Sequence, residues 1–547
     1  MWHKSILDTV RQAKDRGMCL YGAGFWGEVA YKVFTKLGVS PKCFCDDASD
    51  KWGKEYHGIP VYSLEDTVKR YPGAVYIVCA DTIKKRDVWG RKDLERMLHR
   101  LKERNVYDSN SELRIIMYLF LLDLQNLDSL LSGCQKPDLE GSGGLVKASD
   151  LQNLFILNHM GNSGSYYFEQ LFDGHPNVLS LPYSSWVFWT VYEKRLQYLE
   201  GTELLIEMAA QMIGYFHSQY EGLYSLKHYK FADWCVGEHG EFIKDVLIDA
   251  DDFVKYLLAQ LDGATGLKSF GHMMKVYVAA YNNCLGKRKQ EGSAYWLFYH
   301  QHKPDYDVSE MDKYFDKKEF QRIENVILIR EPVQHCYSWI FRGCIKENQY
   351  AGVEKDKSLL HMLMSEMGVM VQKNPEVQNV KAIRFEDLKF QPEQTMQSLC
   401  RWMEIPYLDL MLSTTLNGIQ IYFPTYTEKG LVYITGNDTT AVNRKDFSAV
   451  MTLWDQVRLN MVYGKFKAAY GYGSDIPPFT EFSKETLKEL FQKDFKFAAI
   501  AQKVIDEGSP EEGKYDVNEY VKSVFLEYML NYQDDIEYYD CIKPEEN

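Results

Sequence analysis

Twice along this chain, a short apolar run passes through a glycine-containing turn directly into a helical pattern. The first instance is the run 18–21, followed by GAGFWG and by apolar positions at helical spacing up to residue 37. The second is the run 154–157, followed by a polar loop with two glycines and an amphipathic segment. Units of this kind connect parallel strands, because a parallel neighbour needs a crossover connection. The sequence therefore predicts an α/β protein with parallel sheets.

The length of 547 residues exceeds what one hydrophobic core supports, so we expect several domains. The clearest linker is the segment 128–150, where the composition shifts and GSGG follows a proline. The predicted organisation is a Rossmann-like parallel-sheet domain, a linker, a second α/β domain with helical insertions, and an acidic helical extension, over residues 1–127, 128–150, 151–475 and 476–547.

The charge of the chain argues against a nucleic-acid partner. The formal net charge is −14 and the pI is about 5.5, so no sequence-wide basic field is present to hold a polyanion. Residues 476–547 carry 17 acidic and 8 basic side chains, a net −9 of this −14. An anionic ligand can therefore still bind elsewhere, through local arginine and lysine side chains and helix N-termini.

Cysteine usage and apolar runs indicate the compartment. The 11 cysteines are odd in number and scattered without a CxxC pair, which favours reduced thiols over zinc or redox chemistry. Residues 1–17 carry charges throughout and lack the apolar segment of a signal peptide. The strongest apolar run, 115–122, is far shorter than the ~20 residues that span a bilayer. We expect a cytoplasmic protein without a transmembrane segment.

The N-terminal glycine turn has the spacing of a nucleotide-binding motif. Gly22, Gly24 and Gly27 form GxGxxG between a predicted strand and a predicted helix, and Asp46 ends the next strand. Such glycines let the backbone approach a pyrophosphate, and the acid can bind ribose hydroxyls. The same glycines also suit a tight turn with a packing role only. Both interpretations stay open.

The order GAGxxG, then DD, then KWGKEYHGIPVYSLED resembles small Rossmann-like domains that are attached to bacterial sugar-modifying enzymes. The ligand varies among those domains, so the resemblance implies a fold and leaves any nucleotide unidentified. A nicotinamide-dependent oxidoreductase built on this turn is an alternative function.

The second glycine turn predicts an anion site. Residues 160–164 join a buried strand to a helix N-terminus, where backbone N–H groups and the helix dipole can hold a phosphate. The chain has no GxxxxGK[ST], so an ATP or GTP hydrolase is not expected. Further on, NVILIREPVQHCYSW predicts a strand that ends in Arg330 and a helix that carries Ser338. An arginine can grip a phosphate with two hydrogen bonds, and a serine adds a neutral donor.

Together these motifs resemble the sulfotransferases that use 3′-phosphoadenosine-5′-phosphosulfate (PAPS). GNSGSYYF stands where that family has its 5′-phosphosulfate loop, and Arg330, Glu331, Pro332 and Ser338 keep the frame of its 3′-phosphate site. IRFEDLKFQP, from residue 383, is similar to the family's R-Y-E-D-L-x-x-x-P segment. The resemblance implies a P-loop-like sulfotransferase domain. The PAPS-binding residues that it implies are Gly161, Asn162, Ser163, Gly164, Ser165, Tyr166, Arg330, Ser338, Arg444 and Lys445.

The resemblance also implies sulfuryl transfer without a metal. The family carries Lys or Arg where this chain has Asn162, so positive charge at the leaving phosphate must come from another group, such as His159. AYWLFYHQHKP is similar to the strand that ends in K-T-H-L-P in cytosolic sulfotransferases, which aligns His302 with their catalytic histidine. His300 then takes the place of their lysine and is a second candidate for the missing cation. Arg444 and Lys445 resemble the family's late basic loop, which closes over the nucleotide.

The expected function is therefore transfer of a sulfuryl group from PAPS to a hydroxyl of a small-molecule or glycan acceptor in the cytosol. One alternative is a non-catalytic nucleotide-binding module, because Asn162 removes a charge from the loop. The other is the NAD(P)-dependent oxidoreductase built on GxGxxG. The sequence leaves the acceptor, the oligomeric state and the purpose of the acidic extension open.

Overall fold

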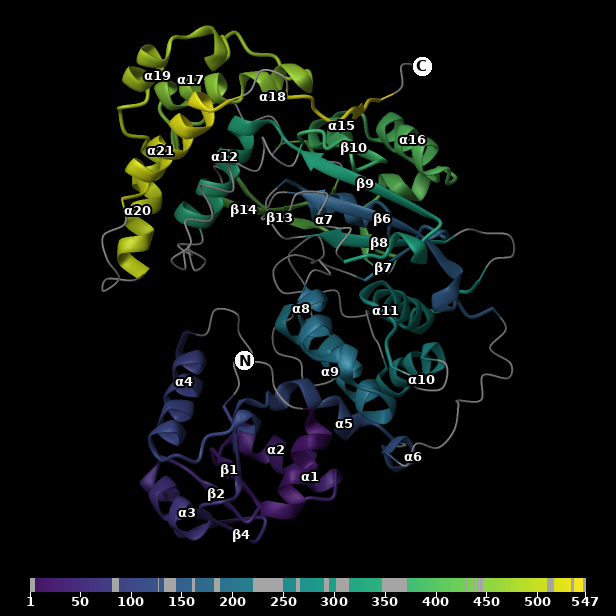
Figure 1. Cartoon of the computed structure of the whole chain (residues 1–547), viewed down its shortest axis with the longest axis vertical. Helices are drawn as coiled ribbons and strands as arrows, with labels where there is room; N and C mark the ends of the chain where they lie inside the picture. Colours follow the sequence, from purple (N-terminus) through teal and green to yellow (C-terminus); the bar gives the residue numbers. More distant parts are fainter. Residues whose placement is uncertain are drawn as a thin grey trace. The chain divides into compact units, whose positions relative to one another are not determined.

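The computed structural model describes most of the chain, and the structural statements below concern the described residues (Figure 1). These are residues 5–80, 88–125, 127–131, 144–159, 163–181, 187–219, 249–261, 266–289, 295–301, 314–346, 371–416, 418–427, 430–436, 438–439, 442, 446–508, 516–532 and 536–544. The chain divides into two compact units. The first unit comprises Met1–Ser149, Val187–Cys235 and Phe242–Glu291, and the second unit comprises Asp150–Trp186, Val236–Glu241 and Gly292–Asn547.

The first unit is built on a five-stranded sheet in the order β3-β4-β2-β1-β5. Its strands are β1 (Met18–Tyr21), β2 (Cys43–Cys45), β3 (Glu55–Tyr56), β4 (Ile59–Tyr62) and β5 (Val75–Val78). Every neighbouring pair is parallel except β3 with β4. All residues of β1 and β5 are buried, as expected for parallel strands covered on both faces. The strand order reverses at β1, which is where open α/β sheets bind ligands.

Ten α-helices of the first unit lie within the described residues. They are α1 (Ile6–Arg16), α2 (Phe25–Lys36), α3 (Leu64–Arg70), α4 (Val88–Glu103), α5 (Phe120–Asp123), α6 (Leu127–Leu131), α8 (Val187–Lys194), α9 (Gly201–Gln219), α10 (Ala250–Gln260) and α11 (Phe270–Cys284). Helices α8 to α11 lie in the stretch that the composition assigns to the second domain.

A buried polar cluster explains why α9 belongs to the first unit. Glu207 of α9 is fully buried, accepts a hydrogen bond of 2.8 Å from the Ile6 amide and forms an ion pair of 2.5 Å with Arg195. The Tyr118 hydroxyl also donates to this carboxylate. A buried carboxylate is tolerated only with such partners, so the cluster fixes α9 to the N-terminal segment. The folding boundary at 128–150 stays a prediction.

The second unit is built on a six-stranded sheet in the order β15-β10-β9-β6-β8-β7, in which every neighbouring pair is parallel. Its strands are β6 (Leu151–His159), β7 (Val178–Ser180), β8 (Tyr295–Gln301), β9 (Arg322–Ile329), β10 (Val380–Arg384) and β15 (Cys541–Ile542). The predicted α/β class with parallel sheets is therefore confirmed. The carboxyl ends of β6, β8 and β9 lie at one edge of this sheet (Figure 1).

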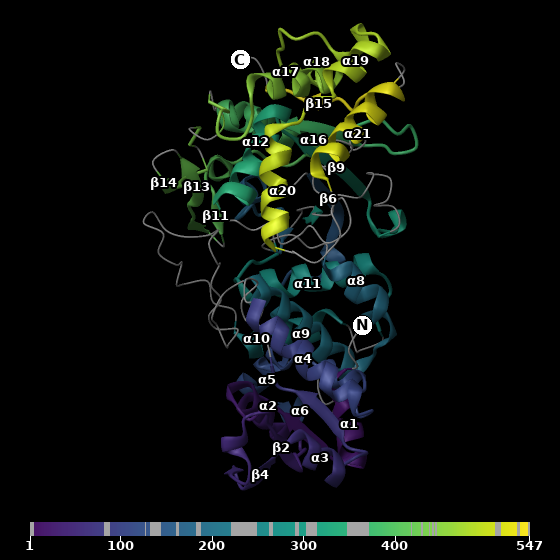
Figure 2. The ribbon, with the colours of Figure 1, turned by 90° about the vertical axis from the view of Figure 1, so that its left-hand side faces the viewer.

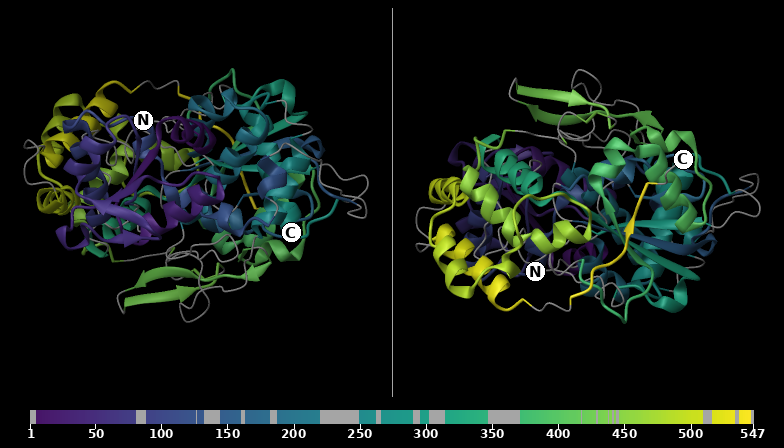
Figure 3. Two further views of the ribbon diagram at one scale, coloured as in Figure 1. Left: turned by 90° about the horizontal axis from the view of Figure 1, so that it is seen from below. Right: turned by 90° about the horizontal axis from the view of Figure 1, so that it is seen from above.

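Helices and two small hairpins complete the second unit. Its helices are α7 (Ser165–Gln170), α12 (Pro332–Ile340), α15 (Phe385–Phe390), α16 (Pro392–Met403), α17 (Leu453–Val462), α18 (Gly464–Ala469), α19 (Lys484–Leu490), α20 (Lys496–Gly508) and α21 (Val517–Leu530). The hairpins pair β11 (Thr415–Leu416) with β12 (Ile419–Gln420) and β13 (Phe423–Thr427) with β14 (Gly430–Ile434). Figure 3 shows the second hairpin extending away from the six-stranded sheet.

The acidic C-terminal segment is helical, as its periodicity predicts, and it is also part of the core. Phe491, Phe495 and Phe525 are fully buried in one apolar cluster with Ile340 of α12. Helix α20 packs against α12 and α21 (Figure 2). The final strand β15 then extends the sheet by pairing with β10. This segment therefore completes the second unit instead of standing apart from it.

Candidate functional site

Three strand ends of the second unit meet at one edge of its sheet. In the sheet register, His300 of β8 lies opposite Leu157, and His159 at the end of β6 lies opposite Leu328. Arg330 directly follows β9, so it leaves the sheet at the same edge. The structure thus brings together the histidines and the arginine that the sequence singles out from distant segments. Carboxyl ends of parallel strands are the usual location of sites in α/β folds.

The glycine turn after β6 can be built only with glycine at one position. Gly164 precedes α7 with φ 94°, a left-handed conformation that other residues rarely adopt. A Cβ atom at this position would lie 2.2 Å from a ring carbon of Phe385. Ser163, 1% exposed, has a hydroxyl oxygen without a hydrogen-bond partner among the described residues. An orphaned buried hydroxyl beside a close-packed turn fits a site that receives a polar ligand.

The other predicted loop residues divide by whether the structure describes them. Ser165 is buried in the first turn of α7, and Tyr166 follows it. Gly161 and Asn162 lie outside the described residues. The same holds for the late basic pair, Arg444 and Lys445, and for the predicted base, His302.

A buried histidine–carboxylate pair lies beside the glycine turn. His300 Nδ1 is 2.6 Å from an Oε atom of Glu169, and both side chains are almost completely buried. The ring centroid of His300 lies 4.6 Å from that of His159 and 5.4 Å from that of Tyr166. A carboxylate in this position can accept a hydrogen bond from Nδ1–H and thereby holds the imidazole in one orientation.

Glu169 was not predicted from the sequence as a site residue. The sequence does contain an indication of its importance, because Glu169 is the only acid in the apolar segment SYYFEQLF. A charged side chain in a helix that packs on a core needs a partner, and here the partner comes from β8.

Arg330 lies in a network of buried charges. Its guanidinium carbon is 5.2 Å from the Phe385 ring centroid, and the residue is 8% exposed. The next residue, Glu331, caps α12 through the Gln334 amide and pairs with Lys467 at 2.9 Å. Its own amide donates to Glu386. Glu331 therefore orders the start of α12, directly after Arg330.

Ser338, the predicted neutral partner of Arg330, is half-buried in the last part of α12. The predicted helix with proline in its first turn is therefore present, since α12 begins at Pro332 and is preceded by Arg330 and Glu331.

Lys389 of α15 is a further cation in this region that the sequence did not single out. The residue is 8% exposed, and its Nζ lies 3.6 Å from the Tyr167 ring centroid and 5.5 Å from that of Phe385. The ammonium donates a hydrogen bond to the Gly436 carbonyl. Burial lowers the pKa of Lys389 to about 7; Asp438 opposes this decrease and Arg330 adds to it. Because a lysine is usually exposed, no pattern in the sequence predicts a buried ammonium at this position.

The first unit has its own cavity, at the carboxyl ends of β1, β2 and β5. Its volume is about 330 Å³, and it is lined by Tyr21, Gly22, Gly24, Phe25, Trp26, Asp46, Asp47, Lys51, Cys79, Ala80, Asp93, Arg96 and Met97. Gly22 has φ 114°, and a Cβ atom at Gly27 would lie 2.1 Å from the Gly22 carbonyl oxygen. No atom lies within 4 Å of a Cβ atom added at Gly24, and this residue precedes α2 without a side-chain cap. Two glycines thus build the turn, and the third leaves room at the cavity.

Asp46 holds the N-terminal glycine turn from within. Its carboxylate accepts hydrogen bonds from the Ala23 amide at 2.7 Å and the Ala48 amide at 2.9 Å, and pairs with Lys51 at 2.9 Å. Burial opposes ionisation, but these three partners outweigh it and lower the pKa of Asp46. The predicted ribose acid is therefore already bonded to the turn that it follows.

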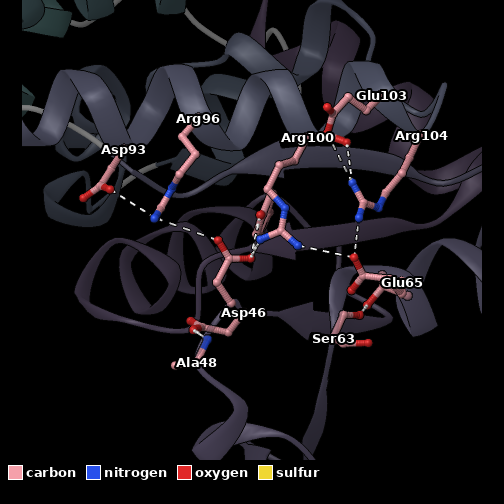
Figure 4. A network of polar contacts seen from close by, with 12 residues as sticks. Asp46, Ala48, Ser63, Glu65, Asp93, Arg96, Arg100, Glu103 and Arg104 are labelled. Carbon is pink, nitrogen blue, oxygen red and sulfur yellow. Dashed lines mark hydrogen bonds and ion pairs between the residues drawn. The ribbon is translucent and has the colours of Figure 1, made fainter.

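Arginines of α4 reach the acids at the strand ends of the first unit. Figure 4 shows Arg96, Arg100 and Arg104 on one side of the helix, as their spacing of four residues requires. Arg96 pairs with Asp93 at 3.1 Å and also approaches Asp47. Arg100 forms an ion pair with Asp47, whose carboxylate also accepts from the Tyr21 hydroxyl. The cavity thus has charges of both signs.

Two features are absent from the described residues. These residues contain no helix that is long and apolar enough to cross a membrane. They also contain no group of three or more His, Cys, Asp or Glu side chains that could hold a metal ion.

Comparisons with known proteins are sparse. No family model matches the chain, and no curated protein matches it. Among solved structures, a sulfotransferase domain from the curacin biosynthetic pathway is similar over 49% of this chain and 78% of that chain, with 14% identity and a TM-score of 0.27. We therefore base the functional proposal on the residues of the site.

Proposed function

We propose that the second unit is a sulfotransferase domain that uses PAPS. The main support is the convergence, at one sheet edge, of the Gly164 turn, buried Arg330 and the buried His300–Glu169 pair. These groups offer backbone donors, a bidentate cation and a histidine held in place. Sulfuryl transfer needs this combination, because an anionic donor must be gripped while a proton leaves the acceptor.

The residues present fit a bisphosphorylated nucleotide. The Gly164 turn lacks a side-chain cap, and the buried Ser163 hydroxyl has no partner among the described residues. In the proposal, Ser163, Gly164, Ser165 and Tyr166 hold the 5′-phosphate, together with Gly161 and Asn162. Arg330 and Ser338 hold the 3′-phosphate, and Arg444 and Lys445 close over the nucleotide. When bound, PAPS supplies the sulfuryl group.

In the proposed chemistry, His302 accepts the proton of the acceptor hydroxyl. His300 supplies positive charge near the leaving phosphate oxygen, as the resemblance implies for the position of the family's lysine. The contact with Glu169 supports this assignment, because a carboxylate oxygen 2.6 Å from Nδ1 would offset a positive charge on the imidazole. His159, in ring contact with His300, is the adjoining candidate. The proposed acceptor is a hydroxyl of a carbohydrate or another cytosolic small molecule.

Two measurements test this function. Calorimetry with 3′-phosphoadenosine-5′-phosphate should show binding, and incubation with radiolabelled PAPS should label a hydroxyl acceptor or release sulfate above background. Binding without transfer or hydrolysis would favour the alternative of a non-catalytic nucleotide-binding module. Absence of binding would refute both.

A second function is supported by the cavity of the first unit. We propose that Gly22 and Gly24 receive the phosphate of an unidentified nucleotide there, with Gly27 and Asp46 keeping the turn in shape. Because the Asp46 carboxylate is bonded to the turn, the oxidoreductase alternative loses the acid that would normally bind the ribose of NAD. Titration with NAD(P)H, followed by nucleotide fluorescence, tests that alternative directly.

A further inference from the structure

We propose that Lys389 and Arg330 form a paired-cation site for a sulfate or phosphate group. Lys389 would thereby add a second cation to the group that the proposed function assigns to Arg330, the 3′-phosphate. This inference rests on the proposed function for its biological ligand, but its physical basis is the geometry around Phe385.

Both cations lie against the same aromatic ring. The Arg330 guanidinium carbon is 5.2 Å and the Lys389 Nζ is 5.5 Å from the Phe385 ring centroid. The same ring packs on Gly164. A Cβ atom added at Gly164 would lie 2.2 Å from a carbon of this ring. The two cations and the glycine turn therefore adjoin one side chain, although they come from three separate segments.

The ammonium of Lys389 has hydrogen-bonding capacity to spare. Within the described part of the chain, its one hydrogen-bond acceptor is the Gly436 carbonyl. An ammonium carries three N–H donors, and the Tyr167 ring at 3.6 Å interacts with the charge without accepting a strong hydrogen bond. A buried ammonium with two further donors is costly unless an acceptor joins it.

The charges around Lys389 favour an anion as that acceptor. Arg330 repels the ammonium and Asp438 attracts it, while burial lowers the pKa of Lys389 to about 7. A dianion bound between Lys389 and Arg330 would attract both cations and thereby offset the repulsion between them. Inorganic sulfate and phosphate monoesters have this charge and accept several hydrogen bonds, and the 3′-phosphate of PAPS is such a monoester.

Sulfate itself is a suitable probe, because it keeps two negative charges from pH 6.5 to 9 while a phosphate monoester titrates. The full chain is titrated by calorimetry at constant ionic strength. Wild type should bind sulfate with an affinity that falls about tenfold per pH unit above about 7, as Lys389 loses its proton. Lys389→Met should bind ~10–100-fold more weakly, the loss of one charge-assisted hydrogen bond, and without that slope.

Two variants separate the effect of the charge at residue 389 from a general effect of substituting a lysine. Lys389→Arg keeps a charge at all these pH values, so it should bind sulfate without the slope and thereby distinguish Lys389 from His159 and His300. Lys381→Met removes a lysine from β10 that lies over Trp402, and should behave as wild type. Sulfate binding in Lys389→Met with wild-type affinity and slope, together with unchanged binding of 3′-phosphoadenosine-5′-phosphate, would overturn the proposal.

The remaining outcomes identify the source of the anion. A Lys389→Met loss for the nucleotide but not for sulfate assigns the site to the esterified phosphate. A loss for both assigns it to the anionic group itself. Failure of wild type to bind either ligand would overturn the inference. Lys389-dependent binding without any sulfuryl transfer would refute the proposed function and leave the paired-cation site standing.

Discussion

The two glycine turns of this protein share a backbone plan and differ in the charges that surround them. In the first unit, the Ala23 amide of the turn that begins at Gly22 already donates to the Asp46 carboxylate, and both acidic and basic side chains line the cavity. In the second unit, the turn at Gly164 packs on Phe385, against which the buried cations Arg330 and Lys389 also lie. A strand, a glycine turn and a helix therefore supply geometry, whereas the residues behind the turn decide which anion can bind.

The largest expected effect concerns the sulfuryl transfer that we propose for the second unit. His302→Ala should lower turnover ~10²–10⁴-fold, the usual contribution of proton transfer, and leave nucleotide affinity nearly unchanged. Single-turnover sulfate transfer at saturating PAPS measures this. Undiminished transfer would remove His302 from the mechanism.

Companion variants define the role of the neighbouring cation in the same assay. His300→Ala should also slow transfer, through poorer charge stabilisation. His300→Lys should recover part of the rate, and Asn162→Lys should restore the loop cation directly.

Matched glycine variants test the difference between the turns. Gly164→Ala should lower the free energy of unfolding by ~2–4 kcal/mol, because the residue has φ 94° and the new methyl group would overlap the Phe385 ring. Gly24→Ala should cost under ~1 kcal/mol, because nothing lies within 4 Å of the added carbon. Chemical denaturation measures both. Similar losses at the two positions would contradict the comparison.

Removing the guanidinium of Arg330 should weaken the binding of a nucleotide that carries a 3′-phosphate. Arg330→Ala should weaken 3′-phosphoadenosine-5′-phosphate binding by ~1.5–3 kcal/mol, the loss of hydrogen bonds to a charged group. Adenosine 5′-phosphosulfate lacks the 3′-phosphate, so its affinity should change little. Equal calorimetric losses for both ligands would mean that Arg330 does not bind the 3′-phosphate.

The smallest effect concerns Asp46 and acid stability. Its pKa is lower in the folded protein than in the unfolded chain, so its stabilisation is present above the unfolded value of about 3.9 and is lost as pH falls through the folded value. Asp46→Asn should therefore be less stable than wild type by ~1 kcal/mol at neutral pH, with a gap that closes in acid. Asp93→Asn, at an exposed ion pair, is the control and should change little. A gap that does not narrow as the pH falls would contradict this account.

The fold was predictable where local pattern decides it. The runs at β1, β6 and β9 are apolar, short and followed by turn and helix signals, and all three are parallel strands. The grouping of α9 with the first unit was not predictable, because it depends on contacts such as that between Glu207 and the Ile6 amide. No period or spacing in the sequence indicates a contact between segments so far apart.

The site follows the same division. The sequence singled out Arg330, His300 and Gly164 as candidates, because strand ends and glycine turns have local signatures, and their roles stay predictions. Glu169 and Lys389 were missed, since their importance depends on partners on β8 and around α15. Asp46 was found, but its bond to the Ala23 amide gives it a role in the turn that the motif does not predict.

The strand β15 carries a consequence for how the chain acquires its structure. Cys541 and Ile542 pair with Ala382 and Ile383, so the outer side of β10 lacks this partner until residues 541–542 have been synthesised. Unpaired backbone groups at a sheet edge are a template for association with other chains. A nascent or truncated chain that stops before residue 536 would present β10 as such an edge, and the yield of soluble protein would then depend on chaperones that shield it.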